Sequence, residues 1–341
     1  MIVQRFMGRH GTAQLMAGIA VGIAAAIIVP DVPGIGDGLG LRTVTVALIY
    51  SLAGVAAAVL YGRLGLVSIM QVALVAVGGW ATLRLHYLTG LPFEVVMILA
   101  AVLTAVIGTV LSLPALRLSG LSLAIVTLMI AGALEVITQY FGFPNGGHGF
   151  AGYDTTGVAQ TMPRPWLGHS DPAFFRYVVV VVLVVMVALW CVLSARPGRT
   201  WAAIRQGDAG AIASGINVTA YRILALAVTS AVTGLAGALL AANSGVLDPI
   251  SFKAQQSVLL FATVLIGGAF SLFGAVIAGL LFYAFPQLLT SWGVNGNLVF
   301  VVLGLGTVQA ITTTPTGIAG QLGGLWQVVR RRLSKKSEAH R

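Results

Sequence analysis

The chain has 341 residues, of which 58% are hydrophobic and only 8% are charged, against about a quarter charged in an average soluble domain. A chain this apolar cannot cover itself with polar surface in water, which excludes an ordinary soluble enzyme, a nucleic-acid-binding domain and a disordered scaffold. The net charge of +10 therefore indicates basic loops near anionic lipid rather than a nucleic-acid surface. We expect an all-α fold, a polytopic transmembrane helical bundle.

Apolar runs along the chain predict about ten membrane spans, with a range of eight to ten. A helix needs roughly 20 apolar residues to cross the bilayer core, and backbone groups in lipid must be bonded within the segment. The predicted spans are 12–29, 43–61, 64–83, 92–113, 121–140, 174–194, 222–242, 255–271, 273–290 and 297–314. The weak point is 255–290, where two short runs joined by glycines can form either a helical hairpin or a re-entrant pair.

The distribution of basic residues predicts the orientation. With the N-terminus inside, fourteen of the 19 Lys and Arg residues fall on the cytoplasmic side, so the positive-inside rule favours both termini in the cytoplasm. Residues 1–320 form the predicted permease domain, followed by a basic cytoplasmic tail at 321–341. Two long loops interrupt it: a Gly/Pro-rich extracytoplasmic loop at 141–173, and a cytoplasmic loop at 195–221 with a short helix that Gly215 ends.

A weak internal sequence repeat links the two parts of the chain. Leu52-Ala53-Gly54 is repeated as Leu235-Ala236-Gly237, on helices that are predicted to begin on opposite sides of the membrane. This arrangement would suit an inverted repeat, a common feature of transporters. Small-residue patterns also arise by chance in membrane helices, so both interpretations stay open.

No recognised catalytic or metal-binding pattern is present in the sequence. The five histidines form no H-x-x-H spacing, one cysteine cannot form a disulfide within the chain, and neither a G-x-S-x-G elbow nor a G-x-x-x-x-G-K-[ST] phosphate loop occurs. We therefore expect no enzymatic activity, no metal and no cofactor bound by this chain. Active transport would need a partner or an ion gradient to supply the energy.

A few polar residues inside predicted spans are candidates for a translocation pathway. Glu135, with Gln139 one turn later, is either a pathway carboxylate or a helix-packing residue, because charge at membrane depth is costly and is usually functional or paired. Ser68 and Gln71 lie three residues apart on one helix face, where they can line a path or bond a neighbouring helix. Thr127 completes this set of candidates.

The block Leu113–Leu128 resembles the L-P-A-L-R-L-x-G-x-x-L-A-I-V-T-L signature of the permeases of branched-chain amino acid ABC importers, the LivM-type subunit in particular. Gly65–Gln71 is similar to the family's G-x-L-S-L-G-Q, with Met70 in place of a glycine. Asn145-Gly146-Gly147 resembles the family's outer glycine turn, and Glu135 falls where the family has the acid of its G-E-I block.

The cytoplasmic loop carries the second specific match. Gly198–Asn217 resembles the family's coupling segment, G-R-x-x-x-A-I-R-x-x-E-x-A-A-x-x-x-G-I-N, with Asp208 for the glutamate and Gly210 for an alanine. Both replacements weaken helix propensity, by up to about 1 kcal/mol for glycine over alanine. Further along, Phe270 occupies the third glycine of the family's G-G-x-G. The resemblance implies that the residues coupling the chain to ATPases are Arg199, Ala203, Arg205, Asp208, Gly215 and Ile216.

Over roughly residues 43–318, the resemblance implies a permease subunit that moves branched-chain or related hydrophobic amino acids inward across the bacterial inner membrane. It also implies partners: a second, homologous LivH-type permease, two cytoplasmic ATPases that bind ATP and Mg²⁺, an extracytoplasmic substrate-binding protein and the lipid bilayer. An ABC permease for urea or short amides is an alternative. An ion-coupled secondary transporter is another, although it leaves the match at 199–217 unexplained.

Overall fold

The computed structural model describes residues 9–32, 38–118, 120–155, 160–293, 296–313 and 317–321, and every regular element in these ranges is helical. The predicted all-α class is thus confirmed for the described part of the chain. The α-helices are α1 (Arg9–Ile28), α2 (Gly38–Val59), α3 (Gln71–Thr89), α4 (Phe93–Ser112), α5 (Gly120–Phe141), α6 (Asp171–Ser194), α7 (Arg196–Gln206), α8 (Asp208–Ala213), α9 (Val218–Ser244), α10 (Ala254–Gly267), α11 (Leu272–Gly279), α12 (Phe285–Ser291) and α13 (Gly296–Thr313).

Six helical stretches in these ranges are long and apolar enough to cross a membrane. They are Gly40–Leu64, Phe93–Leu116, Gly120–Phe141, Asp171–Ser194, Val218–Ser244 and Leu272–Ser291. Shorter apolar helices lie at Gly18–Asp31, Ala254–Gly267 and Leu298–Ala310. These helices are consistent with a multi-pass membrane protein. The count of about ten spans and the location of both termini stay predictions, and the predicted tail lies outside the described residues beyond Gln321.

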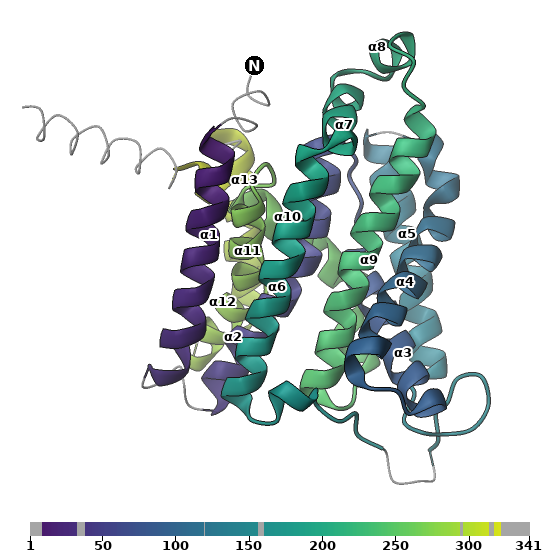
Figure 1. The fold of residues 1–341 in the computed structure, drawn as a ribbon, viewed down its shortest axis with the longest axis vertical. Helices are drawn as coiled ribbons and strands as arrows, with labels where there is room; N and C mark the ends of the chain where they lie inside the picture. Colours follow the sequence, from purple (N-terminus) through teal and green to yellow (C-terminus); the bar gives the residue numbers. More distant parts are fainter. Residues whose placement is uncertain are drawn as a thin grey trace, which may run out of the picture.

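The helices run side by side between two ends of the bundle, which we name the α7 end and the loop end (Figure 1). At the α7 end, α6 finishes, α7 and α8 project, and α9 begins. At the loop end, α5 finishes and the long connection to α6 begins. Arg176 near the start of α6 donates to the carbonyl oxygen of Ala26 near the end of α1 (3.4 Å), so these helices are antiparallel. α1 therefore begins at the α7 end.

Residues 65–70 interrupt the predicted span 64–83. The last turn of α2 continues as a π-helix, Leu60–Leu64, and Gly65 ends it in the left-handed conformation (φ +74°), which glycine adopts without steric cost. The chain then runs extended to Met70, and α3 begins only at Gln71. Irregular backbone at membrane depth must be covered by protein, and Leu66, Ser68 and Met70 are indeed buried.

Two halves of the chain run in opposite directions. α2 and α4 start from the loop end and α3 runs back toward it, whereas α9 and α11 start from the α7 end and α10 runs back toward that end. In each half a long helix is followed by a non-α stretch, at 65–70 or 245–253, and then by a helix that starts inside the bundle. The glycines of the Leu-Ala-Gly repeat face different helices of the opposite half: a Cβ on Gly54 would meet a carbonyl oxygen of α11 at 3.1 Å, and one on Gly237 would meet a carbonyl oxygen of α3 at 2.2 Å. The opposite directions of the two halves are what an inverted repeat requires, but these glycines do not occupy equivalent positions in them.

Residues 255–290 fold as two helices of unequal length. α10 has 14 residues and ends at Gly267, whereas α11, a π-helix at Leu280–Ala284 and α12 continue to Ser291 without interruption. Only the second stretch is long enough to span. α10 begins beside Glu135 of α5, well inside the bundle, and ends at the α7 end. The region is therefore a hairpin with a short first arm.

Candidate functional site

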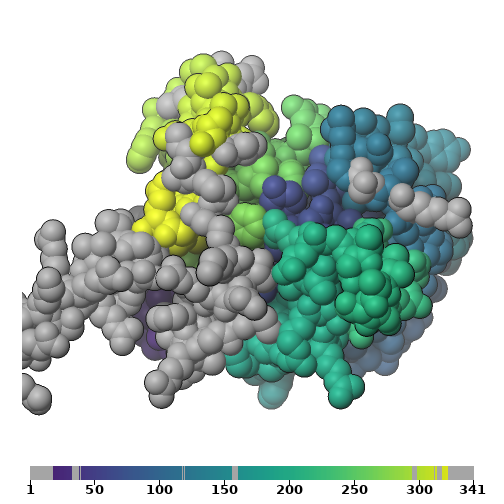
Figure 2. All heavy atoms as spheres, turned by 90° about the horizontal axis from the view of Figure 1, so that it is seen from above, coloured from purple at the N-terminus to yellow at the C-terminus, as the bar shows by residue number. Residues whose placement is uncertain are grey.

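α7 and α8 project beyond the bundle, and we name residues 196–213 the projection (Figure 1). α8 ends as predicted: Gly215 adopts the left-handed conformation (φ +76°), and the amide of Ile216 bonds back to the carbonyl oxygen of Ala211 (3.0 Å). Asn217 then caps α9 through its side chain, which accepts from the amide of Ala220 (3.1 Å). Figure 2, which views this end, shows the teal-green atoms of the projection together on one side of the face.

One face of the projection, which we name the base, packs onto the bundle. It carries Trp201, Ile204, Arg205 and Asp208. Trp201 and Ile204 are buried, and the indole Nε1 of Trp201 donates to the carbonyl oxygen of Tyr221 in α9 (2.9 Å). A buried indole whose N–H is bonded fixes both the position and the rotation of the helix that carries it. α7 is therefore attached to α9.

Arg205 joins α7 to two further segments. Its guanidinium donates to the carbonyl oxygen of Gly62, in the last turn of the helix that continues α2. Carbonyls in the last turn of a helix lack a partner within it, so this one is free to accept. The guanidinium also lies over the ring of Phe270 (4.7 Å to the centroid) and near that of Tyr61 (5.9 Å). Burial lowers the pKa of Arg205, and the interaction with Tyr61 partly offsets this decrease. The guanidinium remains charged at neutral pH.

Asp208 forms an ion pair with Arg222 at the start of α9. The carboxylate accepts two hydrogen bonds from Nη2 of Arg222 (2.7 and 3.0 Å), and Nη1 donates to the carbonyl oxygen of Leu116 (3.1 Å). Leu116 belongs to the block Leu113–Leu128, so Arg222 brings the two specific sequence matches into contact. The Asp208 side chain is 47% exposed, and the pair therefore contributes about 1 kcal/mol or less. The side chain of Arg117 lies outside the described residues.

The opposite face of the projection, which we name the tip, is open. It carries Ala209, Ile212 and Ala213, all exposed, with Ile212 at 63%. Three adjacent apolar side chains at the outermost point of the molecule form a small surface that the rest of the described chain leaves uncovered. Arg199 is exposed nearer to the bundle, where its Nη1 donates to the carbonyl oxygen of Ser194 (3.2 Å).

The six predicted coupling residues do not share one surface. Arg205 and Asp208 lie in the base, and Ile216 packs against the buried cluster around Ile204. Arg199 and Gly215 are exposed, and Ala203 is half-buried. Two residues of the site were not predicted. Ile212 follows the apolar Ala211, so the sequence pattern does not show which of these two side chains is exposed. Arg222 lies 14 residues from Asp208, and no motif connects the two residues.

Three of the predicted pathway residues, Ser68, Gln71 and Thr127, are buried around the extended segment. Thr127 Oγ1 accepts from the amide of Ile69 (3.0 Å), and Gln71 Oε1 accepts from Thr233 (2.8 Å). The hydroxyl of Ser68 and Nε2 of Gln71 have no protein partner. The cavity beside Ser68 and Thr127 has a volume of about 10 Å³, room for about one water molecule. In this conformation these residues line no open passage.

Glu135 and Gln139 meet the start of α10. Oε2 of Glu135 accepts from the amide of Ala254 (2.7 Å), and Oε1 accepts from Nε2 of Gln139 (3.0 Å). A carboxylate here satisfies one of the unpaired amides of a helix N-terminus and opposes the positive end of its dipole. Glu135 therefore acts as a cap supplied by another helix. Each of its oxygens thus already accepts one hydrogen bond from the chain.

The predicted outer glycine turn, Asn145-Gly146-Gly147, lies at the loop end. The side chain of Asn145 donates to the carbonyl oxygen of Asp154 (2.7 Å) and accepts from its amide (2.8 Å). Arg84 of α3 donates to the carbonyl oxygen of Gly149. These bonds fix the turn in shape and attach it to the end of α3.

The ion pairs in the described ranges lie at the two ends of the bundle. Asp171 pairs with Arg164 (2.6 Å) and Arg42 (3.3 Å) at the loop end, and Asp208 pairs with Arg222 at the α7 end. No group of three or more His, Cys, Asp or Glu side chains that could hold a metal ion occurs among these residues.

Over residues 40–310, the sequence matches the family described as the permease component of branched-chain amino acid transport systems. The chain belongs to this family. Its similar proteins include the high-affinity branched-chain amino acid transport system permease protein LivM of Salmonella typhimurium strain LT2 and that of Escherichia coli K12, each 29% identical over 265 residues. Each match covers 72% of this chain but 62% of the relative, so the chain spans less than two thirds of their length.

A third relative matches a shorter part of the chain. It is the probable ABC transporter permease protein YphD of Escherichia coli K12, 30% identical over 138 residues, which is 38% of this chain and 42% of the relative. No solved structure matches the chain. The resemblance read from the sequence is confirmed at the level of the family, whose members are membrane permease components of ABC transporters rather than the catalytic subunits.

Proposed function

We propose that the chain is the translocating permease subunit of a binding-protein-dependent ABC importer for branched-chain or related hydrophobic amino acids. The observation that carries the proposal is the projection, which is bonded to the bundle at its base and uncovered at its tip. It extends from the end that the positive-inside rule predicts to be cytoplasmic. Two ATPase subunits, which bind ATP and Mg²⁺, would dock at that end. A substrate-binding protein would dock at the loop end, on this chain and its LivH-type partner.

In this mechanism the tip binds an ATPase and the base transmits its movement. When the ATPases close on ATP, the projection moves with them. Trp201 passes that movement to α9 through its bond to Tyr221. Arg205 passes it to the last turn of α2 and, through Phe270, to the turn between α10 and α11. Both halves of the fold thereby respond to one input.

The pathway residues then have two roles. Thr127 holds the segment 65–70 in place through its bond to the amide of Ile69, and Gln71 ties the start of α3 to Thr233 of α9, whereas the Ser68 hydroxyl has no partner among the described residues. Glu135 positions the start of α10, and the exposed Gln139 beside it is the residue that can meet substrate.

Reconstituted transport tests the proposal. The full chain, its partner permease and two ATPases would be placed in liposomes with ATP enclosed, and the binding protein and labelled leucine added outside. Leucine should accumulate only with both ATP and the binding protein, and labelled urea should not. Accumulation driven by an imposed proton or sodium gradient without ATP would overturn the importer, and preferred uptake of urea would overturn the substrate class.

A further inference from the structure

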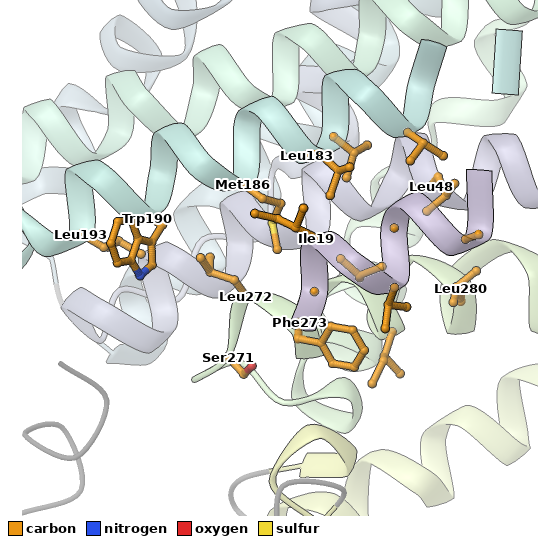
Figure 3. Close-up of a pocket in the computed structure, with 18 of the residues that line it drawn as sticks. Ile19, Leu48, Leu183, Met186, Trp190, Leu193, Ser271, Leu272, Phe273 and Leu280 are labelled. Carbon is orange, nitrogen blue, oxygen red and sulfur yellow. The ribbon is translucent and has the colours of Figure 1, made fainter. Parts of the chain in front are cut away.

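A cavity of about 360 Å³ lies between α1, α2, α6 and α11, separate from the projection and from the polar residues of the proposed pathway. Figure 3 shows the side chains that face it. Most of its lining is aliphatic or aromatic, including Ile19, Leu48, Leu183, Met186, Phe273 and Leu280. A cavity with such walls, between helices that face the bilayer, fits a hydrocarbon chain.

One end of the cavity is polar. Figure 3 shows Trp190 and Leu193 at one end, Leu48 and Leu280 at the other, and Ser271 between them. Ser194 and Arg63 also line the cavity, and both belong to helix ends that lie at the α7 end. The cavity is thus amphipathic along its length, with its polar groups at the predicted cytoplasmic face.

Arg63 brings an unbalanced positive charge to this polar end. No acidic residue in the described ranges lies within ion-pair distance of its guanidinium, and the charged group that acts on it is another cation, Arg205. Arg205 is already engaged by the carbonyl oxygen of Gly62 and two aromatic rings. A half-buried guanidinium in this setting is stabilised by an anion that the chain itself does not supply.

We propose that this cavity binds an anionic phospholipid of the cytoplasmic leaflet, with an acyl chain between α1, α6 and α11 and the phosphate at Arg63. Charge complementarity selects the occupant: an aliphatic cavity needs a hydrocarbon, and its one charged end needs an anion. Basic pockets between membrane helices on the cytoplasmic side bind such headgroups. The inference goes beyond the proposed function, since it does not depend on what the permease carries.

The test compares two lipids with identical acyl chains. The full-length protein, copurified with its partners and delipidated in mild detergent, would be titrated with phosphatidylglycerol or phosphatidylcholine, and bound lipid counted by native mass spectrometry. Phosphatidylglycerol should bind about tenfold more tightly, because both lipids offer a phosphate to Arg63 but only phosphatidylcholine adds a quaternary ammonium, which repels the guanidinium and leaves the headgroup neutral. Arg63→Gln should remove the preference and Arg63→Lys should keep most of it. Arg196→Gln, which removes an exposed cation at the same end, is the matched control and should change nothing.

A second variant tests the acyl-chain part of the cavity. Ile19→Trp would fill the space between α1 and α6, and it should weaken the binding of both lipids while the complex still assembles. Equal binding of the two lipids by the natural sequence would overturn the proposal. So would loss of the preference in Arg196→Gln, or displacement of phosphatidylglycerol by millimolar inorganic phosphate alone.

Cross-linking separates lipid from a protein occupant. In a background in which Cys191 is replaced by alanine, Leu183→Cys would place a thiol on the cavity wall. Modified with benzophenone maleimide, this cysteine would cross-link on irradiation to whatever occupies the cavity, and adducts with lipid, without cross-links to protein, are the expected result. A cross-link to the second permease, or to a terminal segment of the same chain, would show that protein fills the cavity and would overturn the lipid site.

Discussion

The base and the tip of the projection differ in chemistry, although the sequence presents them as one continuous segment. In the base, each polar or charged side chain is committed to the bundle: Trp201 to Tyr221, Arg205 to Gly62, and Asp208 to Arg222. The tip carries small and aliphatic side chains that are exposed on the described chain. Under the proposed function, the tip would bind a partner and the base would transmit its movement.

The largest expected effect comes from the tip. Ile212→Glu should weaken ATPase binding by roughly 100-fold, because it removes a buried aliphatic contact and places a carboxylate in an apolar interface. The variant should fold normally, since Ile212 is 63% exposed in the chain alone. Affinity for the purified ATPase, measured by surface plasmon resonance, checks this. Gln206→Glu, which adds the same charge to an exposed position of α7, is the control and should bind almost as well.

Arg205→Met should give the next largest effect, and of a different kind. It retains the length of the side chain but removes the bond to Gly62 and the cation over Phe270. Transport per ATP hydrolysed should fall by about tenfold while ATPase affinity is unchanged. Arg205→Lys should rescue only partly, because an ammonium lacks the planar stacking face. Loss of ATPase affinity with coupling intact would place Arg205 in the partner interface instead.

Phe270→Gly restores the glycine of the family pattern and tests whether Arg205 acts through its contact with the Phe270 ring. Coupling should fall by about two- to fivefold, the value of an exposed or partly buried cation–π contact. Combined with Arg205→Met, the change should add little, because both variants remove the same contact. Additive effects in the double variant would show that the two residues act separately.

The smallest effect is expected for Asp208→Asn. The pair with Arg222 is half exposed on the Asp208 side, so its removal should cost about 1 kcal/mol or less in the free energy of unfolding. Thermal unfolding at low and high salt checks this, since high salt should reduce the difference between the two proteins. A large loss of ATPase binding in this variant would move Asp208 from the base to the partner surface.

Sequence patterns predicted the fold class and most of the long helices, because apolar runs of membrane length leave few alternatives to a helix. The break at 65–70 could not be predicted. The segment is apolar enough to be predicted as part of a membrane span, through Leu66, Val67, Ile69 and Met70. Its non-helical backbone is stabilised by Thr127 and other residues of distant helices, which cover it. Such breaks are decided by tertiary contacts.

For the candidate site, the family resemblance located the segment but not its faces. Arg205 and Asp208 are charged, and charged side chains on a cytoplasmic loop are ordinarily expected to face outward. Their partners, Gly62 and Arg222, come from helices far along the chain and carry no recognisable motif. Glu135 was equally open between a pathway and a packing role until its contact with the amide of Ala254 showed it as a helix cap.

Copurification tests the central claim most directly. The full-length chain, tagged and solubilised from native membranes in mild detergent, would be compared with Ile212→Glu by quantitative mass spectrometry. The natural sequence should bring down two ATPase subunits and a second permease, and Ile212→Glu should keep the permease but lose the ATPases. A chain that comes down alone, or an Ile212→Glu variant that retains its ATPases, would contradict the account.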